Sequence, residues 1–338
     1  MRYYSIFSGI EAASVAWAPL GWTPLLFSEV DEFPSAVLRH RFPNVPNLGD
    51  ITKIDWREAV RAFGRPDVVV GGSPCQSFSI AGDRTGLDGA SGLMWEYVRC
   101  VREVMPDWLL WENVPGALSS SHGEDFRCLL EALDALGYGL AWRVLDAEFF
   151  GVAQRRERVF VVGRLGDVEG PCEVLFEPES LRWDPPTSRE KREELAARAG
   201  VGAACAGFKW HQGSGAGSIG LEDEQSPTLT ADYHNPAVMC MAGQLQGGDG
   251  SVTGAINATQ SGKQVNGVTD GYAVRRLTPR ECERLQGLHD DWTKVPYRGK
   301  SADECPDTPR YKALGNSFAV PVVRWIGERM QAYEDGAL

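Results

Sequence analysis

The sequence predicts a doubly wound α/β domain with a mostly parallel sheet, together with a smaller, irregular β-rich domain. Two patterns predict the α/β domain: continuous apolar runs alternate with helical periodicity through the first half of the chain, and those runs end in polar residues. A third pattern predicts the β-rich domain, since positions 201–271 are rich in Gly, Ser, Thr, Asn and Gln around short apolar pieces. Low complexity is the competing interpretation of that stretch.

Each element is expected from its own stretch of sequence. Apolar runs predict strands at Tyr3–Phe7, Pro24–Asp31, Asp67–Gly72, Asp107–Val114 and Arg158–Arg164. Helical spacing predicts helices at 11–20, 33–42, Leu93–Met105, 124–138, 185–200, 278–288 and Ser317–Tyr333. Thr278 followed three residues later by Glu281 predicts a capping box at the start of the helix over 278–288.

Composition limits the class of protein. A chain of 338 residues with 43% hydrophobic residues can fill a sizeable core. The sequence has no apolar run of about 18 residues and no signal-peptide block at its N-terminus, so we expect a cytoplasmic protein with no membrane partner. The eight cysteines form no CxxC pair, and the histidines show no zinc spacing, so we expect neither a bound metal nor a disulfide framework.

The charge pattern permits two interpretations. A net charge of −12 argues, taken alone, against nucleic acid as a partner. Local charge decides binding, however, and arginines cluster at positions 154–160 and 275–284. Each cluster is either a nucleic-acid-binding surface or a solvated face of the protein.

Polar residues follow the apolar runs, at the sheet edge where ligands of parallel α/β folds bind. Gly9 follows the first run and lets backbone approach a ligand, and Glu29, about 20 residues later, suits a ribose diol. Asp50 is a third such residue. Each of these residues is equally explained as an ordinary cap at the start of the next helix.

Cys75 and Glu112 suggest covalent chemistry. Cys75 ends an apolar run and is followed by a glycine-rich loop, so a reactive thiol near a closing loop competes with the usual buried structural cysteine. Glu112, followed by Asn113, ends a neighbouring run, where an apolar setting raises a carboxyl pKa and makes it a proton donor near neutrality. A nucleophilic thiol beside a general acid is typical of covalent catalysis.

These residues belong to a series of motifs that resembles the DNA cytosine-5 methyltransferases over essentially the whole chain. In order, the motifs are FSGIEA, FSEVDE, GDI, GGSPCQSFS, ENV, QRRERVF, RRLTPRECERLQG and ALGNSFAVP. The resemblance is to the bacterial and phage type of this family. It implies a class I methyltransferase fold and S-adenosyl-L-methionine as the cofactor. It also implies a catalytic domain at 1–184 plus 312–338 and a target-recognition domain at 185–311.

The resemblance implies a role for each matching residue around the methyl donor. Glu29 would hold the ribose hydroxyls, and Asp50 and Ile51 would flank the adenine. Two departures stand out, since Glu11 replaces a frequent glycine and Val30 a frequent aromatic residue. The implied cofactor-binding residues are Phe7, Ser8, Gly9, Ile10, Glu29, Val30, Asp50, Ile51, Pro74, Asn316 and Ser317.

The resemblance likewise implies a catalytic set. Cys75 would attack C6 of a flipped cytosine, and Glu112 would contact N3 and the exocyclic amine. Arg158 would reach the base carbonyl, Arg156 would organise the site around Glu112, and Gln154 would be structural. The implied DNA-binding residues are Gln76, Ser79, Thr228, Leu229, Arg275 and Arg276.

The sequence therefore predicts methyl transfer to C5 of cytosine within a specific sequence of double-stranded DNA. The same chemistry on tRNA is an alternative, although the long variable segment before RRLTP favours readout of duplex DNA. A non-catalytic DNA-binding relative is a second alternative, and a generic NAD-binding dehydrogenase would leave PCQ and QRRER unexplained. We expect a monomer, with a cognate restriction endonuclease as a candidate partner.

Overall fold

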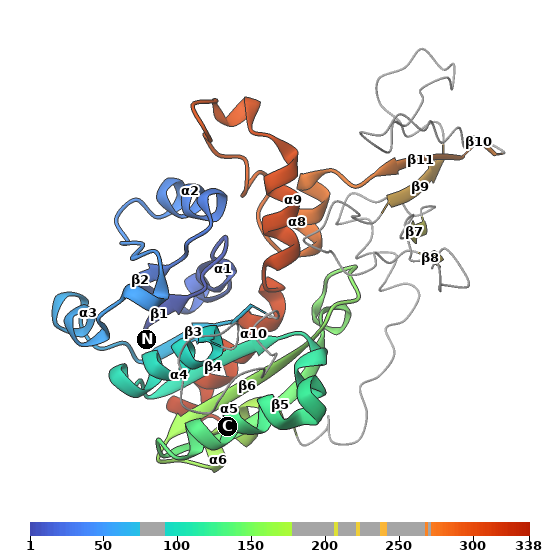
Figure 1. Ribbon diagram of the computed structural model, residues 1–338. Coiled ribbons are helices and arrows are strands. Elements are labelled where there is room, and N and C mark those ends of the chain that lie inside the picture. The colour runs from blue at the N-terminus through green and yellow to red at the C-terminus, as the bar shows by residue number, and fades with distance from the viewer. Residues whose placement is uncertain (75–91, 178–205, 209–220, 224–236, 242–267, 270–271) are drawn as a thin grey trace.

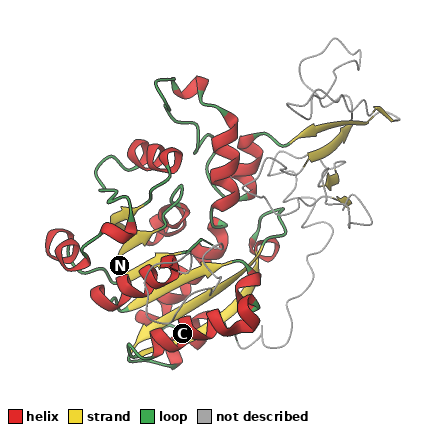
Figure 2. Cartoon of the chain, viewed as in Figure 1, coloured by secondary structure: helices red, strands yellow, loops and turns green. Residues whose placement is uncertain are grey.

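The computed structural model describes residues 1–74, 92–177, 206–208, 221–223, 237–241, 268–269 and 272–338. These residues form two sheets, a large one covered by helices and a small one made of short strands (Figures 1 and 2). In Figure 1 the small sheet lies beyond α8 (Pro279–Leu285) and α9 (Asp307–Asn316), away from the large sheet. No helix in this described part of the chain is long and apolar enough to cross a membrane.

The large sheet is mixed, with a parallel half and an antiparallel half. Its strand order is β2 (Thr23–Ser28), β1 (Arg2–Ile6), β3 (Val68–Gly71), β4 (Trp108–Asn113), β6 (Glu157–Leu165) and β5 (Tyr138–Asp146). The pairs from β2 to β4 are parallel, and β6 is antiparallel to both of its neighbours. The expected doubly wound, mostly parallel sheet is therefore confirmed.

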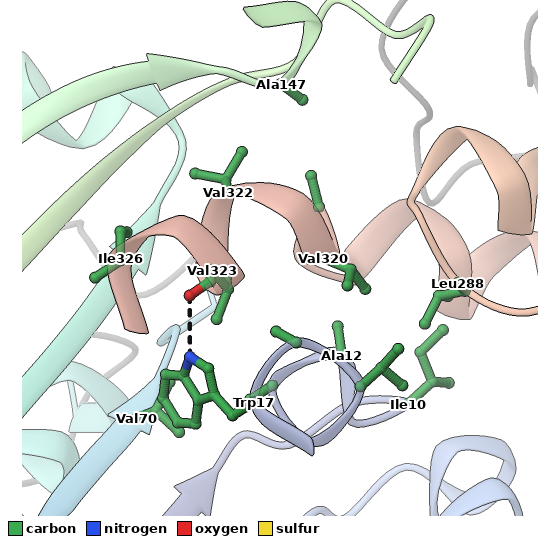
Figure 3. Close-up of a cluster of buried hydrophobic side chains, with 14 of the residues drawn as sticks. Ile10, Ala12, Trp17, Val70, Ala147, Leu288, Val320, Val322, Val323 and Ile326 are labelled. Carbon is green, nitrogen blue, oxygen red and sulfur yellow. Dashed lines mark hydrogen bonds between the residues drawn. The ribbon is translucent and has the colours of Figure 1, made fainter. Parts of the chain in front are cut away.

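Helices cover both faces of this sheet and bury a separate core on each. One core joins α1 (Ala12–Trp17), α6 (Glu169–Leu175) and α10 (Val320–Glu334), and the other joins α3 (Trp56–Phe63), α4 (Gly92–Val104) and α5 (Glu124–Asp134). Figure 3 shows the first core, where the indole of Trp17 on α1 donates a 2.9 Å hydrogen bond to the Val323 carbonyl of α10. The C-terminal helix thus packs directly on the first helix.

Most elements match the sequence predictions, and the differences have physical reasons. The capping box of Thr278 and Glu281 is confirmed at the start of α8. The sequence did not predict β5, because it is an edge strand whose apolar run is interrupted by Gly139 and Arg143. The sequence analysis also did not predict the short helices α3, α6 and α9. The helix predicted at 33–42 is α2 (Glu32–Arg41), which begins and ends one residue earlier than predicted. The helix expected at 185–200 lies outside the described residues.

The small sheet is antiparallel and fits the expectation of a β-rich second region. Its order is β10 (Val268–Thr269), β11 (Tyr272–Arg276), β9 (Ala237–Met241), β7 (Ala206–Phe208) and β8 (Leu221–Asp223). The chain returns to the large domain directly after β11, because Leu277, Leu285 and Leu288 are buried in the same core as Ile10. The boundary at 311/312 remains a prediction, and this packing leads us to propose a boundary near Leu277.

Candidate active site

Parallel register brings the carboxyl ends of four strands to one edge of the large sheet. Ile6 at the end of β1 pairs with Ser28 of β2 and with Gly71 of β3, and Gly71 pairs with Trp111 of β4. The residues that follow these positions are those that the sequence singled out. This edge is where ligands of open α/β sheets bind.

The turn after β3 is fixed to β4 by hydrogen bonds. The side-chain Nδ2 of Asn113 donates to the Ser73 carbonyl at 2.9 Å, and the indole of Trp111 donates to the Ser73 hydroxyl at 3.2 Å. Pro74, expected at the cofactor, is exposed at the end of this turn. Cys75, Gln76 and Ser79 lie outside the described residues, so the structure fixes only the point from which the thiol residue follows.

Glu112 near the end of β4 contacts Arg158 of β6. The Nε atom of Arg158 lies 3.2 Å from Oε1 of Glu112, and both side chains are largely buried. Burial raises the pKa of Glu112, while the guanidinium groups of Arg158 and Arg156 pull that pKa down. The result is a carboxyl that is held in place, has a proton affinity above its ordinary value, and has an oxygen, Oε2, that accepts no hydrogen bond from the residues that the structure describes.

Gly72 makes room for this carboxyl, a role that the sequence analysis missed. A Cβ atom at Gly72 would lie 2.8 Å from Oε2 of Glu112 and 2.9 Å from its carbonyl oxygen. Neither distance is compatible with a side chain, because the carbonyl belongs to the neighbouring strand and has little freedom to shift. The paired glycines of GGSPC carried the available sequence signal.

Arg156 lies just before β6 and connects two parts of the site. Its Nη2 atom donates to the carbonyls of Gly315 at 3.0 Å and Ser317 at 2.8 Å, while its charge acts on Glu112. Burial lowers the pKa of Arg156 to about 9, which leaves the guanidinium protonated at neutral pH. The fully buried Gln154 donates to the Leu285 carbonyl of α8 at 2.9 Å, which fits the structural role expected for it.

The turn between β1 and α1 has an unusual backbone. Phe7, Gly9 and Glu11 have φ angles of 52°, 56° and 62°, all in the left-handed region. The amide of Gly9 donates to Oε2 of Glu29 at 2.7 Å, and the amide of Asp31 donates to Oε1 at 2.7 Å. Burial raises the pKa of Glu29. Among the described residues, no atom beyond Gly9 and its two chain neighbours lies within 4 Å of a Cβ built on Gly9, so these residues leave space beside that backbone.

Glu11, the residue that departs from the family pattern, is a structural part of this turn. It is fully buried and forms the N-cap of α1, accepting from the amide of Ser14 at 3.1 Å and its hydroxyl at 2.9 Å. Its other oxygen accepts from the hydroxyl of Ser5 at 2.7 Å. Burial raises the pKa of Glu11 to about 7. The sequence analysis noted the substitution and missed its role.

The remaining cofactor candidates divide into exposed and structural positions. The interpretation of Asp50 as the end of a strand is wrong, because Asp50 caps the short 3-10 helix Ile51–Lys53 through the amide and hydroxyl of Thr52, at 3.1 and 2.8 Å. Val30 follows Glu29 and is 72% exposed, which leaves an apolar side chain open at the sheet edge. Asn316 is exposed at the end of α9, whereas the neighbouring Ser317 is buried.

The DNA-binding candidates fall mainly beyond what the structure describes. Thr228 and Leu229 lie outside the described residues, and Arg275 and Arg276 are described only as backbone positions of β11. Across the described residues, no group of three His, Cys, Asp or Glu side chains is arranged to hold a metal ion.

Comparisons with known proteins agree with this geometry. Residues 1–198 and 214–332 match the family of C-5 cytosine-specific DNA methylases. A phage P1 protein named DNA N-6-adenine-methyltransferase is 35% identical over 458 aligned positions, which cover 97% of this chain and 61% of that protein. Type II methyltransferase M2.BsuMI of Bacillus subtilis is 29% identical over 98% of this chain and 75% of its own length. The S. pombe Dnmt2 methyltransferase structure superposes with a TM-score of 0.62 at 16% identity over the whole of both chains.

The mixed six-stranded sheet with helices on both faces is the fold of class I methyltransferases, and its ligand edge carries the glutamate and arginine of the predicted site. With the family match over most of its length, the chain belongs to the C-5 cytosine-specific DNA methylase family and is an enzyme of that methyltransferase class. It spans 61% of the phage P1 relative, so that protein contains a further stretch of sequence.

Proposed function

We propose that this enzyme transfers a methyl group from S-adenosyl-L-methionine to C5 of a flipped cytosine in a specific sequence of double-stranded DNA, through a covalent adduct between Cys75 and C6. One observation carries the proposal. Glu112, buried and paired with Arg158, lies on the strand next to the one that leads to Cys75, with Gly72 leaving space beside its carboxyl. A thiol and a protonatable carboxyl at one sheet edge are what addition to a pyrimidine ring requires.

The chemistry follows from the properties of these side chains. Carbon C5 of cytosine is a weak nucleophile until the Cys75 thiolate adds to C6, which moves an electron pair toward N3 and C5. A hydrogen bond or proton from Glu112 to N3 stabilises that electron density, and Arg158 keeps the carboxyl in place. Because C5 and C6 are stacked within a duplex, the base must leave the helix, which costs a few kcal/mol. Bonding of C5 to the methyl group would break the methyl–sulfur bond and release the donor as its neutral thioether. Transfer of the C5 proton to water then returns an electron pair to the C5–C6 bond, and the thiolate leaves C6.

The residues at the other end of the edge fit the proposed methyl donor, which supplies an electrophilic methyl on a sulfonium. The amide-held carboxylate of Glu29 has lone pairs for ribose hydroxyls, because one oxygen accepts from the amide of Gly9 and the other from the amide of Asp31. The open space beside Gly9 admits a ligand close to the backbone, and the exposed Val30 offers an apolar surface for an adenine ring. Arg156 holds the carbonyls on both sides of Asn316 while its charge acts on Glu112, so it connects a proposed cofactor-binding residue with the proposed catalytic carboxyl.

We propose cytosine, and not the adenine named for the phage P1 relative, as the target. An exocyclic amine has its own lone pair and needs no thiol addition, so a PCQ–ENV–QRRER set serves a ring carbon better. The remainder of the relative, which this chain does not match, offers a place for a second activity. The tRNA alternative predicts methylation of folded RNA and is tested in the same assay.

The test is to express the protein in cells without cytosine methylation and to sequence both their DNA and their tRNA by bisulfite and nanopore methods. We expect C5 methylation at one short sequence, and none in a Cys75→Ser variant, because a neutral hydroxyl is far less nucleophilic than a thiolate. Purified protein should also form a covalent complex with duplex DNA containing 5-fluorocytosine when the methyl donor is present. Methylation of adenine alone, of tRNA alone, or near wild-type levels in Cys75→Ser would contradict the proposal.

A further inference from the structure

We propose that Trp292 is a positioning residue for the turn Phe7–Glu11, and that it sets the affinity of the enzyme for its methyl donor. The inference rests on the proposed function, since it assumes that the donor binds at this turn. Trp292 lies about 280 residues further along the chain, in the segment that connects α8 to α9. The resemblance to the methyltransferase family assigned it no role.

The carrying contact is a single hydrogen bond across the domain. The indole Nε1 of Trp292 donates to the carbonyl of Ile10 at 2.8 Å. Ile10 is fully buried and sits between Gly9 and Glu11, both with left-handed backbone. Figure 3 shows Leu288, from the same segment as Trp292, packed beside Ile10. The segment therefore holds the turn by a polar and an apolar contact.

The turn needs an external support because its own backbone is strained. Left-handed φ angles at Phe7 and Glu11 cost free energy for residues with side chains and persist only when surrounding contacts impose them. Within the turn, the amide of Glu11 donates to the Ser8 carbonyl at 3.0 Å. The Ile10 carbonyl that Trp292 binds lies in the same peptide plane as this Glu11 amide. The Ser8 carbonyl lies in the same peptide plane as the Gly9 amide that Glu29 binds, so the bond from Trp292 supports that amide through the Glu11–Ser8 hydrogen bond.

Arg41, the last residue of α2, holds the indole in position. Its guanidinium lies over the Trp292 ring, 5.0 Å from the centroid, and its Nε donates to the Trp292 carbonyl at 3.0 Å. The ring of Phe42 meets the indole edge-on at 5.9 Å. Since α2 begins just after Glu29 and Val30, the same helix supports the indole and the proposed ribose-binding residues.

A buried ion pair holds the backbone on both sides of Trp292. The fully buried carboxylate of Glu283 accepts from the amides of Asp291 at 2.7 Å and Thr293 at 2.9 Å, and Arg310 lies 3.2 Å from it. Asp291 itself has a left-handed φ of 59°. Because the buried carboxylate holds this strained turn on both sides of Trp292, its backbone has little freedom to move. Loss of the indole N–H would therefore leave the Ile10 carbonyl without a replacement donor from this segment.

The test compares Trp292→Phe with Trp22→Phe. Trp22 also donates one part-buried indole bond, to Gln331 at 2.9 Å, but it does so away from the turn, so it controls for the loss of such a bond in general. Binding of S-adenosylhomocysteine is measured by calorimetry, and initial rates give KM and kcat separately. We expect Trp292→Phe to weaken binding and raise the donor KM about five- to tenfold, the equivalent of one hydrogen bond, with kcat and the KM for DNA unchanged. Trp22→Phe should leave all four values at wild-type levels.

A second variant keeps the test decisive if Trp292→Phe folds poorly. Arg41→Ala removes the cation from the indole face while leaving the N–H donor, and we expect a smaller increase of about two- to threefold in the same dissociation constant, with kcat unchanged. Wild-type affinity in both variants, or equal losses in Trp292→Phe and Trp22→Phe, would overturn the inference. Failure of the wild-type protein to bind S-adenosylhomocysteine at all would instead count against the proposed function.

Discussion

Two regions at the same sheet edge use buried carboxylates in opposite ways. Where β4 ends and β6 begins, Glu112 faces the guanidinium of Arg158, and the neighbouring Arg156 adds a second positive charge. At the ends of β1 and β2, Glu11 and Glu29 are held by backbone amides and hydroxyl groups. Burial raises the pKa of all three carboxyls.

The difference separates Glu112, the carboxyl for which we propose a catalytic role (the acting region), from Glu11, a carboxyl that forms part of the fold of the turn (the building region). A carboxyl paired with one side-chain cation can form a hydrogen bond with an incoming nucleobase, while the cation continues to balance its charge. A carboxyl saturated by fixed donors, such as Glu11, has its oxygens committed to the fold. Glu29 lies between these cases, because each of its oxygens accepts from one backbone amide and has a lone pair that a ligand could use.

The largest expected effect comes from changing the carboxyl that acts. Glu112→Gln removes the proton donor and the ion-pair partner of Arg158, so we expect methylation rates to fall about 10²- to 10⁴-fold, the usual contribution of a positioned acid. The measurement is initial rates with labelled methyl donor on duplex DNA. The amide keeps the size of the side chain, so donor binding should remain close to wild type.

Glu157→Gln provides the matched control for that experiment. Glu157 neighbours Arg158 on β6, and its side chain is half exposed beside Arg155. We expect less than a twofold change in rate, because exposed charge pairs contribute about 0–1 kcal/mol. A rate for Glu112→Gln within about threefold of the control would show that Glu112 is not a catalytic residue. The two regions would then not differ in the role of their carboxyls.

A smaller effect is expected from the residue that connects the regions. Arg156→Lys replaces a planar fork by a single ammonium, which cannot satisfy the carbonyls of Gly315 and Ser317 as Arg156 does. We expect an unfolding free energy lower by about 1–3 kcal/mol and a donor KM higher by about tenfold, because one buried carbonyl loses its partner beside Asn316. Urea unfolding and steady-state kinetics measure the two quantities.

Arg164→Lys, on the same strand, is the comparison for Arg156→Lys. Arg164 pairs with Asp167 and Glu334 at the far end of β6, so its replacement should cost stability while leaving the donor KM unchanged. If both lysine variants raise the donor KM equally, Arg156 does not connect the two regions and contributes only to the stability of the fold.

The sequence predicted the acting region better than the building region, for a physical reason. The motifs predicted Glu112, Arg156 and Arg158, which the structure brings together, because the catalytic role proposed for them requires particular residue types at particular strand ends. The supports depend on tertiary contacts between distant segments, so the pattern did not reveal that Gly72 clears Glu112 or that Trp292 reaches Ile10. The sequence left Asp50 open between a strand end and a helix cap, because both favour aspartate before an apolar residue, and the structure shows the cap.

The smallest expected effect concerns the building carboxyl and is seen in the dependence of stability on pH. Glu11 has a pKa of about 7 in the folded protein and an ordinary value near 4.5 when unfolded. Below pH 4.5 the carboxyl is protonated in both states, so its contribution is fully present there. As the pH rises toward 7 the unfolded chain ionises first, and the folded state loses up to about 3 kcal/mol.

Glu11→Gln removes this titration while keeping one oxygen to accept from Ser14. The amide changes the bond to Ser5 and so shifts the free energy of unfolding by an offset that does not vary with pH. We therefore expect the stability of Glu11→Gln relative to wild type to increase by about 1–3 kcal/mol between pH 5 and pH 8, measured by urea unfolding without ligand. The exposed Glu58→Gln, at the N-terminus of α3, should show no such trend. An equal difference at both pH values would mean that Glu11 is ionised in the folded turn, and that this carboxylate too carries charge available to a ligand.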